Sequence, residues 1–239
     1  MATRARGPER RQDPLSRERI VGAAVELLDT VGEGGLTFRA LAERLATGPG
    51  AIYWHVTGKT ELLAAATDAV VAAAVAVEPT ASPVSPQDGI RAVALGLFDA
   101  VEEHPWLTTQ LATQLSRSPW GTVAPRIFES IGRQVRALGV PEGSWFTATS
   151  ALMHYILGAA GQNAANAAST ASASAERPGV DRAALLDAVS AAWKELDPGD
   201  YPFTRAVADQ VRGHDDREQF LDGIALILAG IAVSHSLTT

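Results

Sequence analysis

An all-α fold is predicted by the composition of this 239-residue chain and by the spacing of its apolar residues. Alanine, the residue that favours helices most, is abundant, whereas only 6% of the residues are aromatic. Apolar residues recur every three or four positions in several segments, and long alternating runs of β-branched residues are missing. We therefore expect helices throughout and no strand, in one large domain or two modest ones.

Four helices are expected in the first third of the chain. The first covers residues 16–32, because Ser16 can cap it, its apolar residues share one face, and the glycines at 32, 34 and 35 end it. The other three are expected over residues 37–45, 51–55 and 59–77. Gly48-Pro49-Gly50 breaks the chain between the second and the third. We expect the core of this part to include Ile52, Trp54 and Val56.

A domain boundary is predicted at residues 78–86, which hold three prolines and no helical pattern. The expected organisation is an arm over residues 1–14, a first domain over 15–77 and a second over 87–239. Helices of the second domain are expected over residues 86–104, 106–117, 119–138, 141–168, 181–196, 203–212 and 215–234. Residues 164–175 have low complexity and are either a fraying helix end or a flexible loop.

The charge of the chain is unevenly distributed. Residues 1–60 hold nine basic against seven acidic residues, whereas residues 61–239 hold eleven against twenty. A mildly basic head on an acidic body suits a protein that offers one end to a polyanion. The arm is locally basic, with four arginines in its first eleven residues, and we expect it to be disordered in the free protein. A contact of this arm with a phosphate or a minor groove is the alternative.

Several classes of protein are excluded or disfavoured. The chain has no cysteine, which rules out disulfides, thiolate metal sites and cysteine nucleophiles. No nucleophile elbow, P-loop, HExxH or paired-carboxylate motif occurs, and the spacing of the five histidines does not suggest a metal site. We expect no enzyme, no metal and no cofactor. The N-terminus lacks the apolar segment of a secretory signal, and the apolar stretch Ile224–Val233 is too short to span a bilayer, so a cytoplasmic protein without membrane contact is expected.

The segment Leu36–Leu63 has the pattern of a helix-turn-helix. Two short helices with a tight, glycine-containing turn between them can cross steeply, so that the second lies in the major groove of DNA while the first braces it. The helices before and after this pair each have an apolar stripe to bury against it.

Residues 16–63 resemble the DNA-binding domain of TetR-type transcriptional regulators along their whole length. The resemblance rests on Leu36-Thr37 after the glycine-terminated helix and on Tyr53-Trp54-His55-Val56 followed by Lys59, which is close to the tetracycline repressors. It implies a sequence-specific DNA-binding regulator: a repressor that a small-molecule effector releases from a palindromic operator. The alternative is a helical small-molecule sensor or adaptor that does not bind an operator.

The resemblance also implies roles for individual residues. Arg39 would reach a base, Tyr53 a thymine methyl or the DNA backbone, and His55 and Lys59 phosphates. The full expected set of DNA contacts is Thr37, Phe38, Arg39, Gly48, Pro49, Gly50, Ala51, Tyr53, His55 and Lys59. The sequence departs from the family at Thr47, where an apolar turn residue is usual, and in the opening Gly-Pro-Gly-Ala, which has no long polar side chain. Readout would therefore rest on Arg39, close backbone approach, methyl contacts and DNA shape.

In such regulators the larger domain binds the effector. Aromatic and polar residues of this domain are the candidates for an effector site: Phe98, Trp106, Gln110, Gln114, Trp120, Phe128, His154, Gln162 and Asn163, with Trp145 and Tyr155 as further aromatics. Each aromatic alone is as readily explained as core, and His154 as a hydrogen-bonded core histidine.

The larger domain is also expected to form a homodimer. The final helix carries a broad apolar stripe that includes Phe220, Ile224, Ile227 and Ile231. A four-helix bundle between two copies, made by the helices over residues 141–168 and 214–234, would cover this stripe. The alternative is that the final helix is buried within a monomer.

Overall fold

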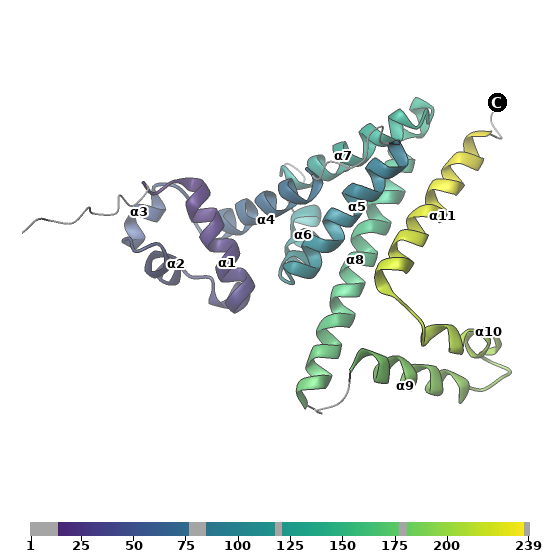
Figure 1. The fold of residues 1–239 in the computed structure, drawn as a ribbon. Helices are drawn as coiled ribbons and strands as arrows, with labels where there is room; N and C mark the ends of the chain where they lie inside the picture. The colour runs from purple at the N-terminus through teal and green to yellow at the C-terminus, as the bar shows by residue number, and fades with distance from the viewer. Residues whose placement is uncertain (1–13, 77–84, 118–120, 177–180, 237–239) are drawn as a thin grey trace, which may run out of the picture. The chain divides into compact units, whose positions relative to one another are not determined.

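The computed structural model describes residues 14–76, 85–117, 121–176 and 181–236, and all regular structure in them is helical (Figure 1). The predicted all-α fold is therefore confirmed. The contacts divide the chain into two compact units, Met1–Ala69 and Val70–Thr239. This division falls within a helix, α4 (Lys59–Val75). Most of the predicted arm and most of the predicted linker lie outside the described residues.

The first unit holds α1 (Arg17–Gly35), α2 (Phe38–Arg44), α3 (Pro49–Tyr53) and most of α4. Hydroxyl caps begin the first two helices as predicted: Ser16 accepts from the Arg19 amide and Thr37 from the Ala40 amide. Gly32 adopts a left-handed backbone, with φ of 67°, so the regular part of α1 ends there as expected. Large side chains from all four helices form one fully buried core, including Ile20, Leu28, Leu41, Ile52 and Leu62.

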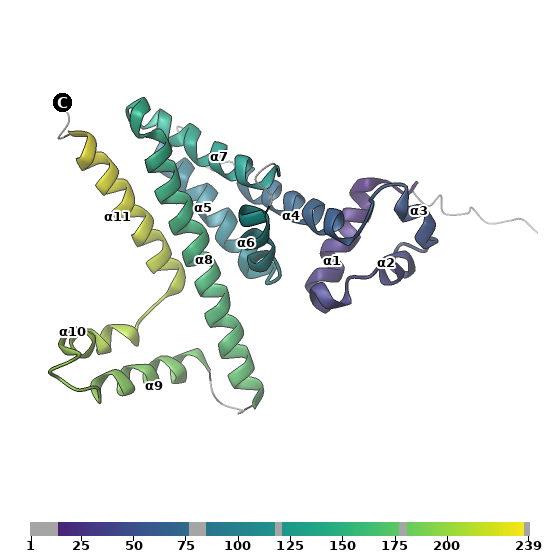
Figure 2. The same cartoon turned by 180° about the vertical axis from the view of Figure 1, so that it is seen from behind.

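The second unit begins with α5 (Pro86–Glu103), α6 (Leu107–Arg117) and α7 (Val123–Ala137). A short 3-10 helix, Glu142–Ser144, leads into the long α8 (Trp145–Glu176). The chain continues through α9 (Arg182–Lys194), α10 (Pro202–Ala206) and a second 3-10 helix, Ala208–Val211, to α11 (Asp216–Ser236). Helix α8 packs against α5, α7 and α11, and α9 packs against α10 and the 3-10 helix that follows it (Figures 1 and 2).

Three helices predicted for the second unit differ from the structure in their extent. Helix α7 begins at Val123 rather than at residue 119, with Pro125 in its first turn, where the missing amide has no intrahelical partner to lose. The expected helix over residues 203–212 is divided between α10 and a 3-10 helix. Helix α8 begins four residues later than predicted and extends to Glu176, well beyond residue 168.

The low-complexity segment over residues 164–175 therefore belongs to α8. Its alanines favour the helix, and its hydroxyl residues bond back to the preceding turn. Ser169 donates to the Ala165 carbonyl at 2.9 Å and Thr170 to the Asn166 carbonyl at 3.0 Å. Of the two alternatives left open by the sequence, the flexible loop is excluded.

Helices α8 and α11 approach each other closely at Tyr155. Its hydroxyl donates to the carbonyls of Gln219 and Phe220, at 3.3 and 3.2 Å. A Cβ atom added to Gly223 would lie only 1.9 Å from the same hydroxyl oxygen. The glycine is therefore what allows the two helices to meet here. At the start of α11 the Asp215 carboxylate accepts from the Glu218 amide at 2.8 Å and so caps the helix.

Within the described ranges, none of the helices combines the length and the apolar character needed to cross a bilayer.

Candidate nucleic-acid interface and ligand cleft

The turn between α2 and α3 has an unexpected left-handed residue. Ala46 has a φ of 51°, whereas the neighbouring Gly48 is extended, with φ of −84°, and serves as the N-cap of α3. The Thr47 amide donates to the Ala42 carbonyl at 3.0 Å, which closes the turn. Helix α3 begins at Pro49, two residues earlier than predicted, because proline is well suited to the first helical position.

Arg39 stands on the outer face of α2, with 88% of its side chain exposed. Within the described part of the chain, its guanidinium pairs with the Glu43 carboxylate one turn further along, at 3.0 Å. An exposed ion pair of this kind contributes little stability and is readily exchanged for another anion. Arg39 is therefore free to reach outward, as its predicted role requires.

Aromatic side chains cover the outer end of α3. The rings of Phe38 and Tyr53 stack in parallel, with centroids 4.3 Å apart, and Tyr53 is 54% exposed. The next residue, Trp54, is 90% exposed, so its predicted place in the core was wrong. Its neighbours Ile52 and Val56 are buried as expected. Because α3 has only five residues and ends at Tyr53, Trp54 leaves the helix on its outer side.

Neither backbone conformation nor internal packing requires glycine at positions 48 and 50. Both have negative φ, and a Cβ added to either would meet no atom within 4 Å. The opening of α3, from Gly48 to Ala51, thus leaves its main chain uncovered on the outer side. Such a surface permits close approach of another molecule to the backbone.

Two hydrogen bonds join the start of α1 to α4 and to the loop before it. The Arg17 guanidinium donates to the His55 carbonyl at 2.6 Å and to the Glu61 carboxylate at 2.8 Å. Glu61 also accepts from the amide and the hydroxyl of Thr57, both at 2.7 Å. These hydrogen bonds, above all that from the Thr57 amide, lower the pKa of Glu61 from 4.5 to about 2.

These hydrogen bonds of Arg17, Thr57 and Glu61, which we call the brace, were not predicted from the sequence. Thr57 and Glu61 are four residues apart, one more than the spacing of a capping box, so this pair matches no standard capping pattern. The participation of Arg17, 44 residues away from Glu61, has no local signal in the sequence.

Lys59 already has a partner within the protein. Its ammonium donates to the Glu33 carbonyl at 2.6 Å and so ties the start of α4 to the end of α1. An ammonium has three donors, so a phosphate can still be bound by the two that remain. Thus the predicted DNA contacts share the outer side of α2, α3 and the start of α4, with Arg39 and Tyr53 the most prominent side chains.

The predicted effector residues are scattered over the second unit. Phe98, Trp106 and Gln110 are buried, Gln114, Phe128 and Asn163 are half-buried, and His154 and Gln162 are exposed. His154 is therefore not a core histidine. Trp120 lies outside the described residues. Of the two further aromatics, Trp145 donates to the Val140 carbonyl at 2.6 Å, and Tyr155 joins α8 to α11.

Two of the predicted effector residues, Phe98 and Asn163, lie in the wall of one cleft of about 480 Å³. The end of α5 forms one side of it, α8 the other, and the starts of α9 and α11 complete it. The alanine-rich wall was not predicted, because most of its alanines belong to the low-complexity segment over residues 164–175. A volume of this size suits a drug-sized molecule.

Comparison with protein families identifies both units. Residues 20–66 match the model for the bacterial regulatory proteins of the tetR family, and residues 82–234 match the model for the C-terminal domain of tetracycline-repressor-like proteins. Together the two matches cover most of the chain and include α2, α3, the cleft and α11.

Individual relatives agree with this assignment. The transcriptional repressor DrrR1 of Streptomyces coeruleorubidus is 30% identical over 95% of this chain and 82% of its own length. The structure of SCO7222, a TetR regulator from Streptomyces coelicolor, is 76% identical, with a TM-score of 0.82 over 92% of this chain and 99% of that one. BioQ with its double-stranded DNA operator is 29% identical, with a TM-score of 0.52 over 64% and 88% of the two chains. The chain is a DNA-binding transcriptional regulator of the TetR family.

Proposed function

We propose that the chain is a cytoplasmic repressor that binds a palindromic operator as a homodimer and leaves it when a small molecule binds the second unit. The observation that carries the DNA-binding part is the outer side of α2 and α3. Arg39 and Tyr53 extend from it, and the backbone from Gly48 to Ala51 is uncovered. The operator complex of BioQ supports the same role for the corresponding unit of this chain.

Base recognition in this proposal differs from that of a recognition helix with long polar side chains. Arg39 is placed to form a bidentate contact with a guanine, and the stacked ring of Tyr53 offers an apolar edge to a thymine methyl group. The open backbone at Gly48 and Gly50 permits the DNA to approach more closely than a larger side chain would allow. Thr37, Phe38, Pro49, His55 and Lys59 then contribute backbone-positioning contacts.

The homodimer is supported by the exposed faces of α8 and α11. Small and apolar residues share the outer face of α11: Ala225, Leu226, Ala229 and Val233. The stripe that the sequence predicted at the interface is partly buried within the monomer instead, because Phe220 and Ile224 belong to its core. The other face of the helix is open, with Leu226 74% exposed. The outer face of the adjacent α8 carries Ala151 and Gly158, and a Cβ at Gly158 would meet nothing. A second copy of the same pair of helices would cover these faces as a four-helix bundle.

Release by an effector follows as a population shift. A symmetric dimer binds two half-sites only if its recognition helices are about one DNA turn apart, roughly 34 Å. A ligand can bind more tightly to a dimer whose recognition helices have a different spacing. It then lowers the affinity of the dimer for the operator, at most by the ratio of the ligand's affinities for the two states.

Selection from random double-stranded DNA with the purified full chain tests this proposal. We expect enrichment of one palindromic sequence. Binding to it should weaken steeply as the salt concentration rises from about 50 to 200 mM, because phosphate contacts release counterions. Binding of all sequences alike at about 150 mM salt would contradict it and would favour a helical sensor without an operator.

A further inference from the structure

The cleft in the second unit has one long wall of small side chains. Five alanines of α8 line it, on three successive turns: Ala160, Ala164, Ala167, Ala168 and Ala171. Eleven residues of helix separate the first from the last, which corresponds to about 16 Å. Phe98, Val101 and Pro105 form the opposite, apolar side. The space is therefore long and narrow, and it fits a flat or extended molecule better than a compact one.

The charges around this cleft are unbalanced. Among the residues that the structure describes, its lining includes the carboxylates of Glu102, Asp215 and Asp216 and two cations, Arg182 and Arg217. Both cations are engaged: Arg182 pairs with Asp216 at 2.7 Å, and Arg217 contacts both carboxylate oxygens of Asp99. His214 also contacts Asp216, at 2.8 Å.

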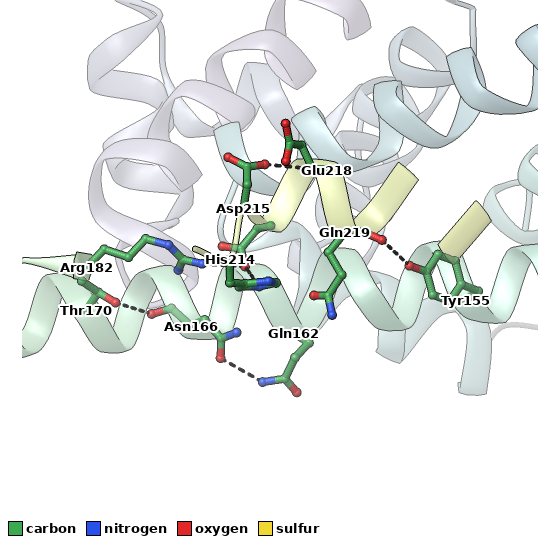
Figure 3. Close-up of polar contacts among 10 residues, drawn as sticks. Tyr155, Gln162, Asn166, Thr170, Arg182, His214, Asp215, Glu218 and Gln219 are labelled. Atoms are coloured by element: carbon green, nitrogen blue, oxygen red, sulfur yellow. Dashed lines mark hydrogen bonds and ion pairs between the residues drawn. The ribbon is translucent and has the colours of Figure 1, made fainter. Parts of the chain in front are cut away.

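Two carboxylates are left over. Among the described residues, neither Glu102 nor Asp215 forms an ion pair, and both are close enough to Arg217 to raise its pKa further, after the larger effect of Asp99. One Asp215 oxygen caps α11, where it faces the Glu218 amide (Figure 3). The cleft thus combines apolar walls with an excess of negative charge at its rim. Burying a cationic ligand beside uncompensated carboxylates is favourable, whereas burying an anion there is not.

We propose that this cleft binds an elongated, mostly apolar molecule that carries a protonated nitrogen, with its body along the alanines of α8 and the positive charge near Glu102 and Asp215. The half-buried Asn163, which lies in the same wall, offers an additional hydrogen-bonding group. This inference rests on the proposed function, because it names the chemical class of the effector.

Three acridines that share one ring system but differ in charge test whether the cleft prefers a cation. At pH 8, above the range in which imidazole side chains ordinarily titrate, 9-aminoacridine is a cation, acridine is neutral and acridine-9-carboxylate is an anion. Titration of the full chain without DNA, followed by fluorescence, gives the affinity of each. We expect the cation to bind about tenfold more tightly than acridine, and the anion to bind more weakly than either.

Variants of the two carboxylates locate the binding site. Glu102→Gln and Asp215→Asn should each weaken binding of 9-aminoacridine by about three- to tenfold and leave binding of acridine unchanged. Asparagine is as good an N-cap as aspartate, so Asp215→Asn preserves α11. The matched control is Glu195→Gln, an exposed carboxylate directly after α9 that is not among the described residues of the cleft lining.

A second pair of variants tests the alanine wall. Ala167→Leu should reduce the affinity for all three acridines at least about tenfold by filling the space, whereas Ala191→Leu, on an exposed position of α9, should not.

Equal binding of cation and neutral acridine, or binding that survives both the carboxylate variants and Ala167→Leu, would overturn the inference. A chain that selects an operator but shows no preference for the cation contradicts this inference alone. One that binds the cation in the cleft but selects no DNA contradicts the proposed function alone.

Discussion

At the scale of single residues, the backbone of the turn between α2 and α3 is strained at a residue that the sequence does not single out, Ala46. Two glycines, Gly48 and Gly50, lie within or beside the break that separates α2 from α3, yet the left-handed position is taken by Ala46. For an alanine this conformation costs about 1–2 kcal/mol, and glycine adopts it without that cost. Trp54 also differs from its prediction. Its large apolar ring favours burial, but the residue directly follows the five-residue helix α3 and is exposed.

Ala46→Gly should therefore stabilise the first unit. Relief of the left-handed strain exceeds the entropy that glycine adds to the unfolded chain, so the free energy of unfolding should rise by about 0.5–1 kcal/mol. Urea denaturation followed by circular dichroism measures the change. Ala191→Gly, inside α9, is the control and should lower stability by a similar amount. A loss of stability in both variants would show that Ala46 is not strained.

At the scale of elements, capping residues and apolar spacing predicted nearly every helix, while contacts between helices escaped prediction. Ser16, Thr37 and Asp181 cap the helices that follow them because a hydroxyl or carboxylate acts on its own local chain. The brace from Arg17 to Glu61 and the approach of Gly223 to Tyr155 join segments more than 40 residues apart, so their partners are defined only by the fold.

The brace at Glu61 should make the first unit sensitive to acid. The pKa of Glu61 is lowered from 4.5 to about 2 in the folded chain, so the stabilisation is complete above about pH 5 and is lost as the pH falls from 4.5 towards 2. Glu61→Gln should be less stable than the parent chain at pH 7, and the difference should vanish near pH 2. Urea midpoints of both proteins over this range measure it. Glu43→Gln, on an exposed ion pair, should show a much smaller difference. A difference between Glu61→Gln and the parent that stays constant down to pH 2 would contradict the role of the carboxylate.

The contact at Gly223 should be intolerant of any side chain. Gly223→Ala places a methyl group 1.9 Å from the Tyr155 hydroxyl and should cost about 1–3 kcal/mol of stability by separating α8 from α11. In a Tyr155→Ala background the same substitution should cost nothing, and this double-mutant cycle assigns the effect to the pair. Gly22→Ala, which meets open space in α1, is the control and should be neutral or stabilising. Additive costs in the cycle would refute the account.

At the scale of the whole molecule, the sequence predicted an all-helical protein and the helix-turn-helix, whereas it did not predict the cleft of the second unit. The helix-turn-helix could be recognised because its residues are contiguous from Leu36 to Leu63. The cleft is assembled from α5, α8, α9 and α11, and its wall is made of alanines, which carry no chemical signature by themselves. Seven of the nine predicted effector residues therefore do not appear in its described lining.

The proposed homodimer makes a prediction at this scale. Leu226→Asp introduces a charge on the exposed face of α11 without disturbing the monomer core, and should weaken self-association about a hundredfold or more. Sedimentation equilibrium measures the dissociation constant. Phe203→Asp, on the equally exposed α10, is the control and should leave it unchanged. A parent chain that is monomeric at micromolar concentration, or equal effects of both variants, would contradict the proposed interface.

The affinity of Arg39→Ala for the selected operator, compared with that of Arg133→Ala, tests the central claim most directly. Both arginines are exposed and pair with a glutamate one helical turn away, so the two substitutions remove the same charge and a similar ion pair. Loss of a base contact costs about 1–3 kcal/mol, so Arg39→Ala should bind the operator roughly tenfold or more weakly while its affinity for random DNA changes little. Arg133→Ala should bind like the parent chain. Equal operator affinities of the two variants would contradict the claim that the outer face of α2 and α3 reads DNA.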